Sequence, residues 1–364
     1  MSTIAIDARK IKSSTGRYVY ELVKNLEQID SKNQYKVLVL ANEVDYYKPS
    51  KPNFEVVVAD FPHYSLAEQT GFNRFLRNLN ADLVHFYMPQ QPLLYTRPAV
   101  TTVHDLNLVR VKENDMNPLE LFVKKNIFKV LLRTVAHRTT HIITPTQFTK
   151  DDLVRWSHIN PSKVTVTYLG VYQIEKAKPV KRYENVPYLT YLGRAEPYKN
   201  NRRMIEAHQQ LLRTNPELRM VIMGALDDLR KADMAWVKEK GYKNVDFLGW
   251  TSDEEAAWLY QHSLAYVGPS WMEGFGLPAL EAMQQGTPVV SANTTCSPEV
   301  FGDGAHYFDP FDTDDMARAI SEVLTDQQLR KKLIAAGAVQ VKKYSWQKMA
   351  NQTLAVYESA LKTT

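Results

Sequence analysis

The chain has 364 residues, more than one hydrophobic core usually supports, so two domains of roughly 150 to 200 residues are expected. Hydrophobic residues make up 44% of the chain and charged residues 23%, which is ordinary for a folded globular protein and excludes a disordered one. The single cysteine, Cys296, excludes an internal disulfide, and no apolar run approaches the roughly 20 residues that cross a bilayer.

The formal net charge of +5 is concentrated in the first half of the chain, since residues 1–170 hold 22 Lys and Arg against 16 Asp and Glu. So small an excess either favours an anionic partner or serves only solubility, and no nucleic acid partner is expected. The opening residues, MSTIAID, lack the basic, apolar and small-residue regions of a secretory signal, so we expect a cytoplasmic protein.

Short runs of apolar and β-branched residues alternate with helix-like segments, which is typical of parallel sheets flanked by helices. A polar stretch with two prolines, residues 169–187, interrupts the alternation and predicts a linker. We therefore predict two doubly wound α/β domains, 1–170 and 171–344, whose ligands bind at the carboxyl ends of strands in a shared cleft. The last segment, 345–364, has helical apolar spacing and is expected to pack back onto the first domain. The expected strands are 3–7, 35–40, 54–58, 82–86, 99–103, 140–144 and 164–168 before the linker, and 188–193, 219–224, 244–249, 264–268 and 287–291 after it.

The segment SWMEGFGLPALEAMQQGTP, residues 270–288, predicts a strand-to-helix loop. Pro278 suits the first turn of a helix because of its fixed φ, and Gly286 is placed to end that helix. Gly274 and Gly276 lack Cβ atoms, so the loop can bring N–H groups and a helix N-terminus close to an anion such as phosphate. An ordinary turn without a ligand is the alternative interpretation.

Two carboxylates flank this loop and favour a ligand. Glu281, expected in the first turn of the helix, can accept hydrogen bonds from hydroxyls, as an acid does with ribose in dinucleotide folds. Glu273 faces whatever is attached beyond the phosphates. A ligand with hydroxyls at both ends and phosphates between them is a nucleotide sugar.

The two glutamates, with seven residues between them in PSWMEGFGLPALEAMQQGTPVV, resemble the signature of the retaining glycosyltransferases of family 4, which have the GT-B fold of two Rossmann-like domains facing a cleft. The resemblance is strongest to the bacterial mannosyl- and rhamnosyltransferase-like branch. It extends over nearly the whole chain through TGRYVYELVKNL (15–26), VHDLNLVR (103–110), TPTQFTKDDL (144–153), YLGRAEPYKN (191–200), VDFLGWTSDEEAAWLY (245–260) and SPEVFGDGAHYFDP (297–310).

The resemblance implies a role for each motif. Arg194 and Lys199 would bind the donor diphosphate and stabilise its departure. His104, after a strand of the first domain, would donate a hydrogen bond near the donor sugar. Gly16 would let backbone approach the phosphates or the acceptor, although SSTGRY lacks the first glycine of the family's usual GIGRY. The other donor-binding residues implied are Gly274, Phe275, Gly276, Leu277 and Glu281, with the base near Trp250.

The implied mechanism is transfer with retention, in which the acceptor hydroxyl attacks from the face that the diphosphate leaves and a phosphate oxygen takes its proton. Glu273 would hold sugar hydroxyls and favour positive charge on the anomeric carbon; a double displacement through a covalent intermediate remains open. Neither a metal nor another cofactor is expected. The acidic run FDPFDTDD (308–315) is explained by Asp312 or Thr313 capping a helix, and Cys296 by packing.

A basic segment in the first domain raises the question of a membrane contact. Lys125, Lys129 and Arg133 recur at four-residue spacing in a stretch without acids, with apolar neighbours at Phe122, Val123, Phe128, Leu131 and Leu132. One hypothesis is that this helix rests on anionic lipid headgroups at the inner face of the membrane. The other is a packing helix with a solvated face.

Together with these observations, the resemblance implies a metal-independent retaining glycosyltransferase that moves a hexose to a glycan or lipid-linked saccharide. GDP-mannose is the favoured donor, with UDP- or dTDP-hexoses as alternatives. Two other functions remain open: a non-catalytic GT-B subunit of a glycosyltransferase complex, and a nucleotide-sugar epimerase.

Overall fold

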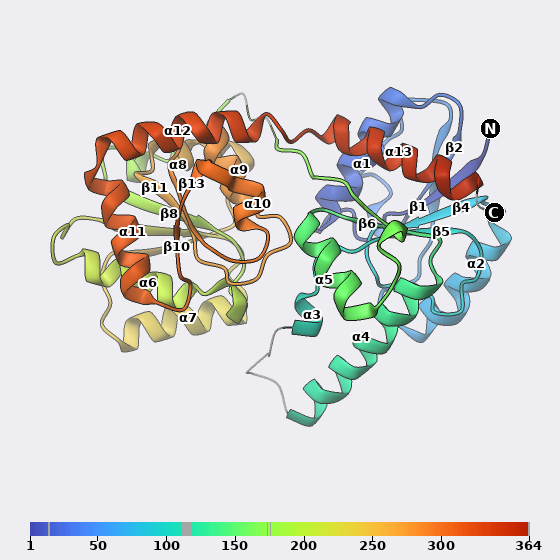
Figure 1. Ribbon diagram of the computed structural model, residues 1–364, viewed down its shortest axis with the longest axis horizontal. Coiled ribbons are helices and arrows are strands. Elements are labelled where there is room, and N and C mark those ends of the chain that lie inside the picture. The colour runs from blue at the N-terminus through green and yellow to red at the C-terminus, as the bar shows by residue number, and fades with distance from the viewer. Residues whose placement is uncertain (14, 111–117, 173, 175, 363–364) are drawn as a thin grey trace. The chain divides into compact units, whose positions relative to one another are not determined.

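The computed structural model describes residues 1–362 apart from 14, 111–117, 173 and 175, with the backbone alone for 118–124. The chain divides into two compact units, which are described separately. Unit 1 consists of Met1–Gly170 and Ser345–Thr364, and unit 2 of Val171–Tyr344. Each unit is one parallel sheet with helices packed against it (Figure 1), so the predicted doubly wound α/β architecture is confirmed.

The sheet of unit 1 has seven strands in the order β3-β2-β1-β4-β5-β6-β7, all of them parallel. The strands are β1 (Thr3–Asp7), β2 (Gln34–Val39), β3 (Phe54–Val58), β4 (Leu83–Phe86), β5 (Ala99–Thr102), β6 (His141–Thr144) and β7 (Val164–Val166). The helices are α1 (Gly16–Ile29), α2 (Asn73–Asn78), α3 (Asn107–Arg110), α4 (Pro118–Arg138), α5 (Gln147–Ser157) and α13 (Trp346–Lys362), with short turns η1 (Ala41–Glu43), η2 (Glu68–Phe72) and η3 (Pro161–Lys163).

The sheet of unit 2 has six parallel strands in the order β10-β9-β8-β11-β12-β13. The strands are β8 (Tyr188–Leu192), β9 (Arg219–Met223), β10 (Val245–Gly249), β11 (Ala265–Gly268), β12 (Val289–Ala292) and β13 (Ala305–Phe308). The helices are α6 (Asn201–Leu211), α7 (Asp228–Glu239), α8 (Asp253–His262), α9 (Leu277–Gln284), α10 (Ser297–Phe301), α11 (Thr313–Thr325) and α12 (Gln327–Val341), with turns η4 (Lys181–Tyr183), η5 (Pro197–Lys199) and η6 (Gly302–Gly304).

The central strands of both sheets are almost wholly buried, as expected for parallel strands covered on both faces. This burial explains why their sequences are continuous apolar runs and why each predicted run coincides with a strand to within one or two residues. Strand β13 was not predicted, because AHYF is a short run between a glycine and an aspartate.

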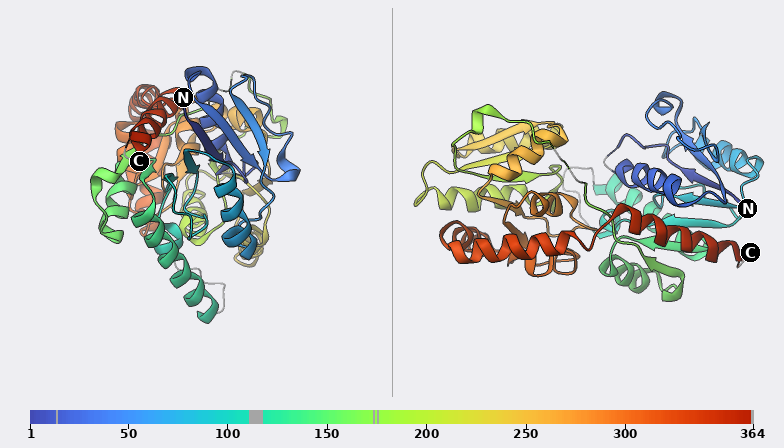
Figure 2. Two further views of the ribbon diagram at one scale, coloured as in Figure 1. Left: turned by 90° about the vertical axis from the view of Figure 1, so that its right-hand side faces the viewer. Right: turned by 90° about the horizontal axis from the view of Figure 1, so that it is seen from above.

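The C-terminal helix α13 belongs to unit 1, where it packs along α1 and against β4, β5 and β6 (Figure 2). Met349, Val356 and Tyr357 form its buried side. Within the part of the chain that is described, no helix combines the length and the apolar character that crossing a bilayer requires.

The strand order reverses at one point in each sheet. In unit 2 the reversal lies between β8 and β11, and in unit 1 between β1 and β4. Ligands of doubly wound folds bind at such a switch point, outside the carboxyl ends of the strands. A ligand site of unit 2 is therefore expected at the loops that leave β8 and β11.

Candidate active site

Two neighbouring loops of unit 2 carry three of the four predicted catalytic residues: the β8 loop (residues 193–200) and the β11 loop (residues 269–276). They leave adjacent parallel strands at the same edge of the sheet. Backbone joins them, since the N–H of Trp271 donates to the carbonyl oxygen of Tyr198 at 3.0 Å. The structure brings Lys199 and Glu273 together here, with 2.6 Å between Nζ and Oε1.

The Lys199–Glu273 pair is largely shielded from water, with side chains 17% and 22% exposed. Burial lowers the pKa of Lys199, but the charge of Glu273 and the hydrogen bond to it outweigh burial and raise the pKa above its ordinary value. Lys199 is therefore a fixed positive charge at neutral pH. It lies at the position where phosphates bind in this class of sheet.

Arg194, the other predicted cation, is the second residue of the β8 loop and is exposed to solvent. Its side chain is 63% exposed and pairs with Glu196 at 2.7 Å, so the structure does not bring it to Glu273 as it brings Lys199. Asn201 holds this part of the loop by donating from Nδ2 to the carbonyl oxygen of Arg194 at 3.0 Å.

The segment from Glu273 to α9 has the expected turn chemistry. Gly276 adopts φ +84 and precedes the helix, and Pro278 lies in its first turn. A Cβ on Gly276 would come within 2.6 Å of the Phe301 ring, so glycine is required there by backbone and packing alike. Gly286 follows the helix with φ +78, as predicted for its end.

Two residues of this segment differ from their predicted surroundings. Glu281 was expected in the first turn of the helix, but α9 begins at Leu277, so the buried Glu281 is its fifth residue and no acid lies in the first turn. Phe275 is buried and packs edge-to-face on Tyr344 with ring centroids 5.3 Å apart, so only its backbone could serve a ligand.

The backbone of Glu273 is held by the loop that follows β12. Its N–H donates to Oγ1 of Thr295 at 3.3 Å, and Thr295 adopts φ +50, a left-handed conformation that β-branched residues rarely take. Neither Thr295 nor Asn201 was predicted. A threonine gives no sequence signal for positive φ.

Trp250 follows β10 and is 83% exposed. Gly249 before it faces Leu226, whose Cδ1 would lie 3.4 Å from a Cβ on the glycine. Leu226 is itself partly exposed and was not singled out from the sequence. Two accessible apolar side chains thus follow the neighbouring strands β9 and β10 at the edge that carries Lys199.

His104 lies just after β5 in unit 1, with Nε2 2.9 Å from the carbonyl oxygen of Tyr87. Burial lowers the pKa of His104 to about 4, so the ring is neutral at neutral pH. A carbonyl oxygen only accepts, so the single N–H of the ring is engaged at Nε2. Toward a ligand the ring offers Nδ1 as an acceptor, where the sequence interpretation expected a donor.

Gly16 begins α1, after the loop that leaves β1. A Cβ at this position would meet the carbonyl oxygens of Lys10 and Ile11 at 2.2 Å. The glycine therefore accommodates the turn of its own loop. A role in approaching a ligand stays a prediction.

The basic residues predicted for a lipid contact lie on α4. Lys129 and Arg133 are exposed and Lys125 is half-buried, while the Arg133 guanidinium donates to the carbonyl oxygen of Trp156 at 3.3 Å and lies 5.3 Å from the centre of its ring. The predicted apolar neighbours face the core instead: Leu131 and Leu132 are buried and Phe128 packs against the same cluster. The side chains of Phe122 and Val123 lie outside the described residues. Among the side chains of the helix that are described, the accessible apolar ones are Ile127, 62% exposed, and Val130, 63% exposed.

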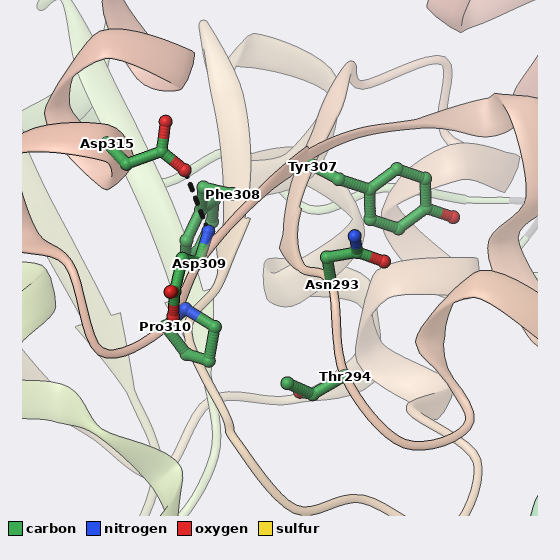
Figure 3. A pocket seen from close by; sticks show the side chains of 7 residues that line it. All are labelled: Asn293, Thr294, Tyr307, Phe308, Asp309, Pro310 and Asp315. Atoms are coloured by element: carbon green, nitrogen blue, oxygen red, sulfur yellow. Dashed lines mark hydrogen bonds between the residues drawn. The ribbon is translucent and has the colours of Figure 1, made fainter.

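A shallow polar hollow of about 440 Å³ opens beside the candidate site, at the carboxyl ends of β12 and β13 (Figure 3). None of the predicted site residues lines it, so the switch point, where Lys199 and Glu273 converge, remains the better candidate. The acids of the segment 308–315 have local partners, because Asp315 accepts from the N–H of Asp309 at 2.8 Å and Asp312 caps α11, as predicted. Among the described residues no group of three or more His, Cys, Asp or Glu side chains is arranged to hold a metal ion. The lining residues are Asn293, Thr294, Tyr307, Phe308, Asp309, Pro310 and Asp315.

Comparisons with known proteins identify the family of the chain. Residues 15–172 match the family model of Glycosyltransferase Family 4, and residues 173–340 match that of Glycosyl transferases group 1. The O-antigen chain mannosyltransferase B of Escherichia coli is 29% identical over 75% of this chain and 72% of its own length. The O-antigen chain mannosyltransferase RfbU of Salmonella typhimurium is 28% identical over 86% of this chain and 88% of its own.

Among solved structures, the sucrose-phosphate synthase of Thermosynechococcus elongatus superposes over the full length of both chains with a TM-score of 0.80 at 18% identity, a likeness of fold. The two family models meet within two residues of the boundary between the two units and together leave only residues 1–14 and 341–364 unmatched. The chain therefore belongs to the group 1 and family 4 glycosyltransferases and has the GT-B fold.

Proposed function

We propose that this glycosyltransferase moves a hexose, with mannose favoured, from a nucleotide-diphosphate sugar to a glycan or lipid-linked saccharide, with retention of configuration and without a metal. The observation that carries the proposal is the pair of Lys199 and Glu273, 2.6 Å apart at the switch point of unit 2. A shielded cation and a carboxylate on adjacent strand ends suit a ligand that carries phosphate next to hydroxyls.

In this mechanism the departing diphosphate is stabilised by positive charge and backbone N–H groups. Lys199 supplies a permanent charge, Arg194 is exposed and able to leave Glu196, and the glycines of the β11 loop allow close approach to the N-terminus of α9. Glu273 holds sugar hydroxyls and favours positive charge on the anomeric carbon. The acceptor hydroxyl gives its proton to a phosphate oxygen, so no side-chain base is required.

The donor is proposed from the relatives and from one surface feature. Two curated relatives are named as mannosyltransferases of O-antigen chains, which favours GDP-mannose over UDP- or dTDP-hexoses. Leu226 and Trp250 offer accessible apolar surface on which a base can stack. His104, neutral and with Nδ1 as acceptor, suits a hydroxyl of the sugar.

The test is a donor panel of GDP-mannose, UDP-glucose and dTDP-rhamnose. For each donor, the slow release of nucleoside diphosphate and the shift in melting temperature are measured. One donor is expected to be cleaved and to stabilise the wild type, and Lys199→Ala and Glu273→Ala are expected to lower the rate of its cleavage at least about 100-fold. EDTA should leave the rate unchanged, and the product should keep the donor's anomeric configuration in its NMR couplings. A folded wild type that neither binds nor cleaves any donor would contradict the proposal.

We further propose that α4 contacts an anionic membrane surface. Lys129 and Arg133 are exposed on this helix together with Ile127 and Val130, and basic residues beside accessible apolar side chains are typical of interfacial helices. Vesicle flotation tests this. Binding to phosphatidylglycerol vesicles over phosphatidylcholine vesicles is expected, and the triple variant Lys125→Glu, Lys129→Glu, Arg133→Glu should lose it.

A matched control reverses three exposed lysines of unit 2 instead, Lys240→Glu, Lys331→Glu and Lys332→Glu. This control changes the net charge by the same amount and should still float with the anionic vesicles. Equal recovery of the wild type from neutral and anionic vesicles would end the membrane proposal and leave the proposed chemistry untouched.

A further inference from the structure

Asn200 follows Lys199 directly and is buried, with φ +59 and ψ +31. Left-handed backbone is costly for most residues but tolerated by glycine and asparagine. The conformation turns the chain sharply between η5 and α6, and the N–H of Asn200 donates to the carbonyl oxygen of Pro197 at 3.1 Å. Lys199 is therefore presented from a tight, closed turn.

The side chain of Asn200 joins three loops. Its Nδ2 donates to the carbonyl oxygen of Pro269 at 3.1 Å and to that of Pro310 at 2.7 Å. Pro269 begins the β11 loop, and Pro310 lies in the β13 loop (residues 309–312). Its Oδ1 accepts from the Arg203 guanidinium at 3.1 Å. Both hydrogens of the amide are thus used on backbone carbonyls of other loops.

These bonds span the edge of the sheet. Strand β11 is next to β8, and β13 lies two strands farther on, so one amide links loops from three of the six strands. Lys199 is the residue before Asn200, and Glu273 lies four residues after Pro269 in the β11 loop. The Asn200 amide therefore ties the turn that presents Lys199 to the loop that carries Glu273.

We propose that Asn200 is a positioning residue of this enzyme: its amide holds the β8, β11 and β13 loops in register, so that Lys199 and Glu273 stay paired and aimed at the donor. The inference rests on the proposed function, because it concerns the same donor site. It does not place Asn200 in contact with the substrate.

The decisive variant is Asn200→Gly, which keeps the left-handed turn and removes the three amide contacts. The matched control is Asn244→Gly. Asn244 also has positive φ, +57, and its Nδ2 donates to a proline carbonyl, that of Pro216, at 2.9 Å. Asn244 precedes β10, however, and therefore lies at the amino ends of the strands, whereas Lys199 follows the carboxyl end of β8.

The rate of donor cleavage is measured for both variants with GDP-mannose, or with the panel donor that the wild type cleaves. Asn200→Gly is expected to lower kcat at least about 30-fold, and Asn244→Gly less than about twofold, at similar melting temperatures. In a Lys199→Met background Asn200→Gly should add less than about threefold, because the group it positions is already gone.

The inference is overturned if Asn200→Gly has the same kcat as Asn244→Gly. It is also overturned if Asn200→Gly lowers kcat by the same factor in the Lys199→Met background as in the wild type. If Asn200→Gly does not fold, Asn200→Asp replaces the donating NH₂ by oxygen and keeps the acceptor for Arg203; it must show the same loss, and normal activity overturns the inference. A wild type that cleaves no donor instead contradicts the proposed function.

Discussion

At the scale of single residues, the ion pair of Lys199 and Glu273 determines the net charge that the site offers to a donor. Without a donor, Glu273 neutralises Lys199, and a diphosphate must compete with the carboxylate for the same ammonium. The raised pKa of Lys199 means that this charge is present below about pH 10.4 and is lost only at higher pH, so donor binding should not titrate through Lys199 between pH 6 and 9.

Two variants of this pair should therefore change nucleotide affinity in opposite directions. Glu273→Gln removes the competing charge and is expected to tighten binding of nucleoside diphosphate while lowering kcat at least about 100-fold. Lys199→Met is expected to weaken binding and lower kcat together. Calorimetric titration with GDP, or with the diphosphate of the donor that is cleaved, measures both affinities. Weaker binding by Glu273→Gln would show that the carboxylate does not compete.

Thr295 is a strained residue whose hydroxyl accepts the N–H of Glu273. Left-handed backbone at a β-branched residue costs about 1–3 kcal/mol, and glycine removes that strain. Thr295→Gly is expected to raise the free energy of unfolding by about 1 kcal/mol, after part of the gain is offset by the flexibility of glycine in the unfolded chain, while kcat falls. Urea unfolding and donor cleavage measure the two effects. Thr295→Ser keeps the hydroxyl and should retain kcat; a Thr295→Gly enzyme with wild-type kcat would rule out the positioning role.

At the scale of elements, helix α9 lies between two glycines with positive φ that make different demands. An added methyl group at Gly276 would collide with the Phe301 ring, whereas one at Gly286 would meet no atom within 4 Å. Gly286→Ala should therefore cost only the backbone strain, about 1–2 kcal/mol of unfolding free energy, with unchanged donor cleavage.

Gly276→Ala should lose more stability than Gly286→Ala, because the Phe301 ring must also move, and should weaken donor binding because the β11 loop shifts with it. Thermal unfolding of the two variants together with their KM for the donor makes the comparison. Equal effects on KM would mean that the start of α9 does not shape the donor site.

At the scale of the whole molecule, the strands were predictable because burial on both faces makes their sequences continuously apolar. The convergence of Lys199 and Glu273 was also predictable, since both follow strands of one parallel sheet. The predictions that failed concern features that depend on contacts between residues distant in sequence. The N-terminus of α9 is set by Gly276 against Phe301, which moved Glu281 out of the first turn.

The same reason explains the residues that were missed. Thr295 and Asn200 have their conformations fixed by loops from other strands, and nothing local announces a threonine with positive φ. On α4, helical spacing identified an apolar stripe but not the direction in which it faces, and Leu131 and Leu132 proved to be core residues. Loop-to-loop hydrogen bonds and the choice of buried face are tertiary properties.

Three histidines, distributed over both units, should make the molecule sensitive to acid: His85 and His208 are buried and His104 is half-buried. Burial lowers the pKa of His85 to about 3 and those of His104 and His208 to about 4. In the unfolded chain each titrates near pH 6.5, so between about pH 6.5 and 4 the unfolded state binds more protons than the folded state. The free energy of unfolding should therefore decrease as the pH is lowered across this window, by up to about 1.4 kcal/mol per pH unit for each histidine.

His208 gives the cleanest variant, because its Nε2 faces the carbonyl oxygen of Leu218 at 3.1 Å and glutamine can offer a non-titrating N–H in its place. His208→Gln should flatten the dependence of unfolding free energy on pH between 6.5 and 5, by up to about 1.4 kcal/mol per pH unit, and His158→Gln, at an exposed position, should not. Urea unfolding at several pH values measures the slopes. If His208→Gln and the wild type lost stability in parallel, the acid sensitivity would have to come from other groups, and His208 would already be charged or accessible in the folded protein.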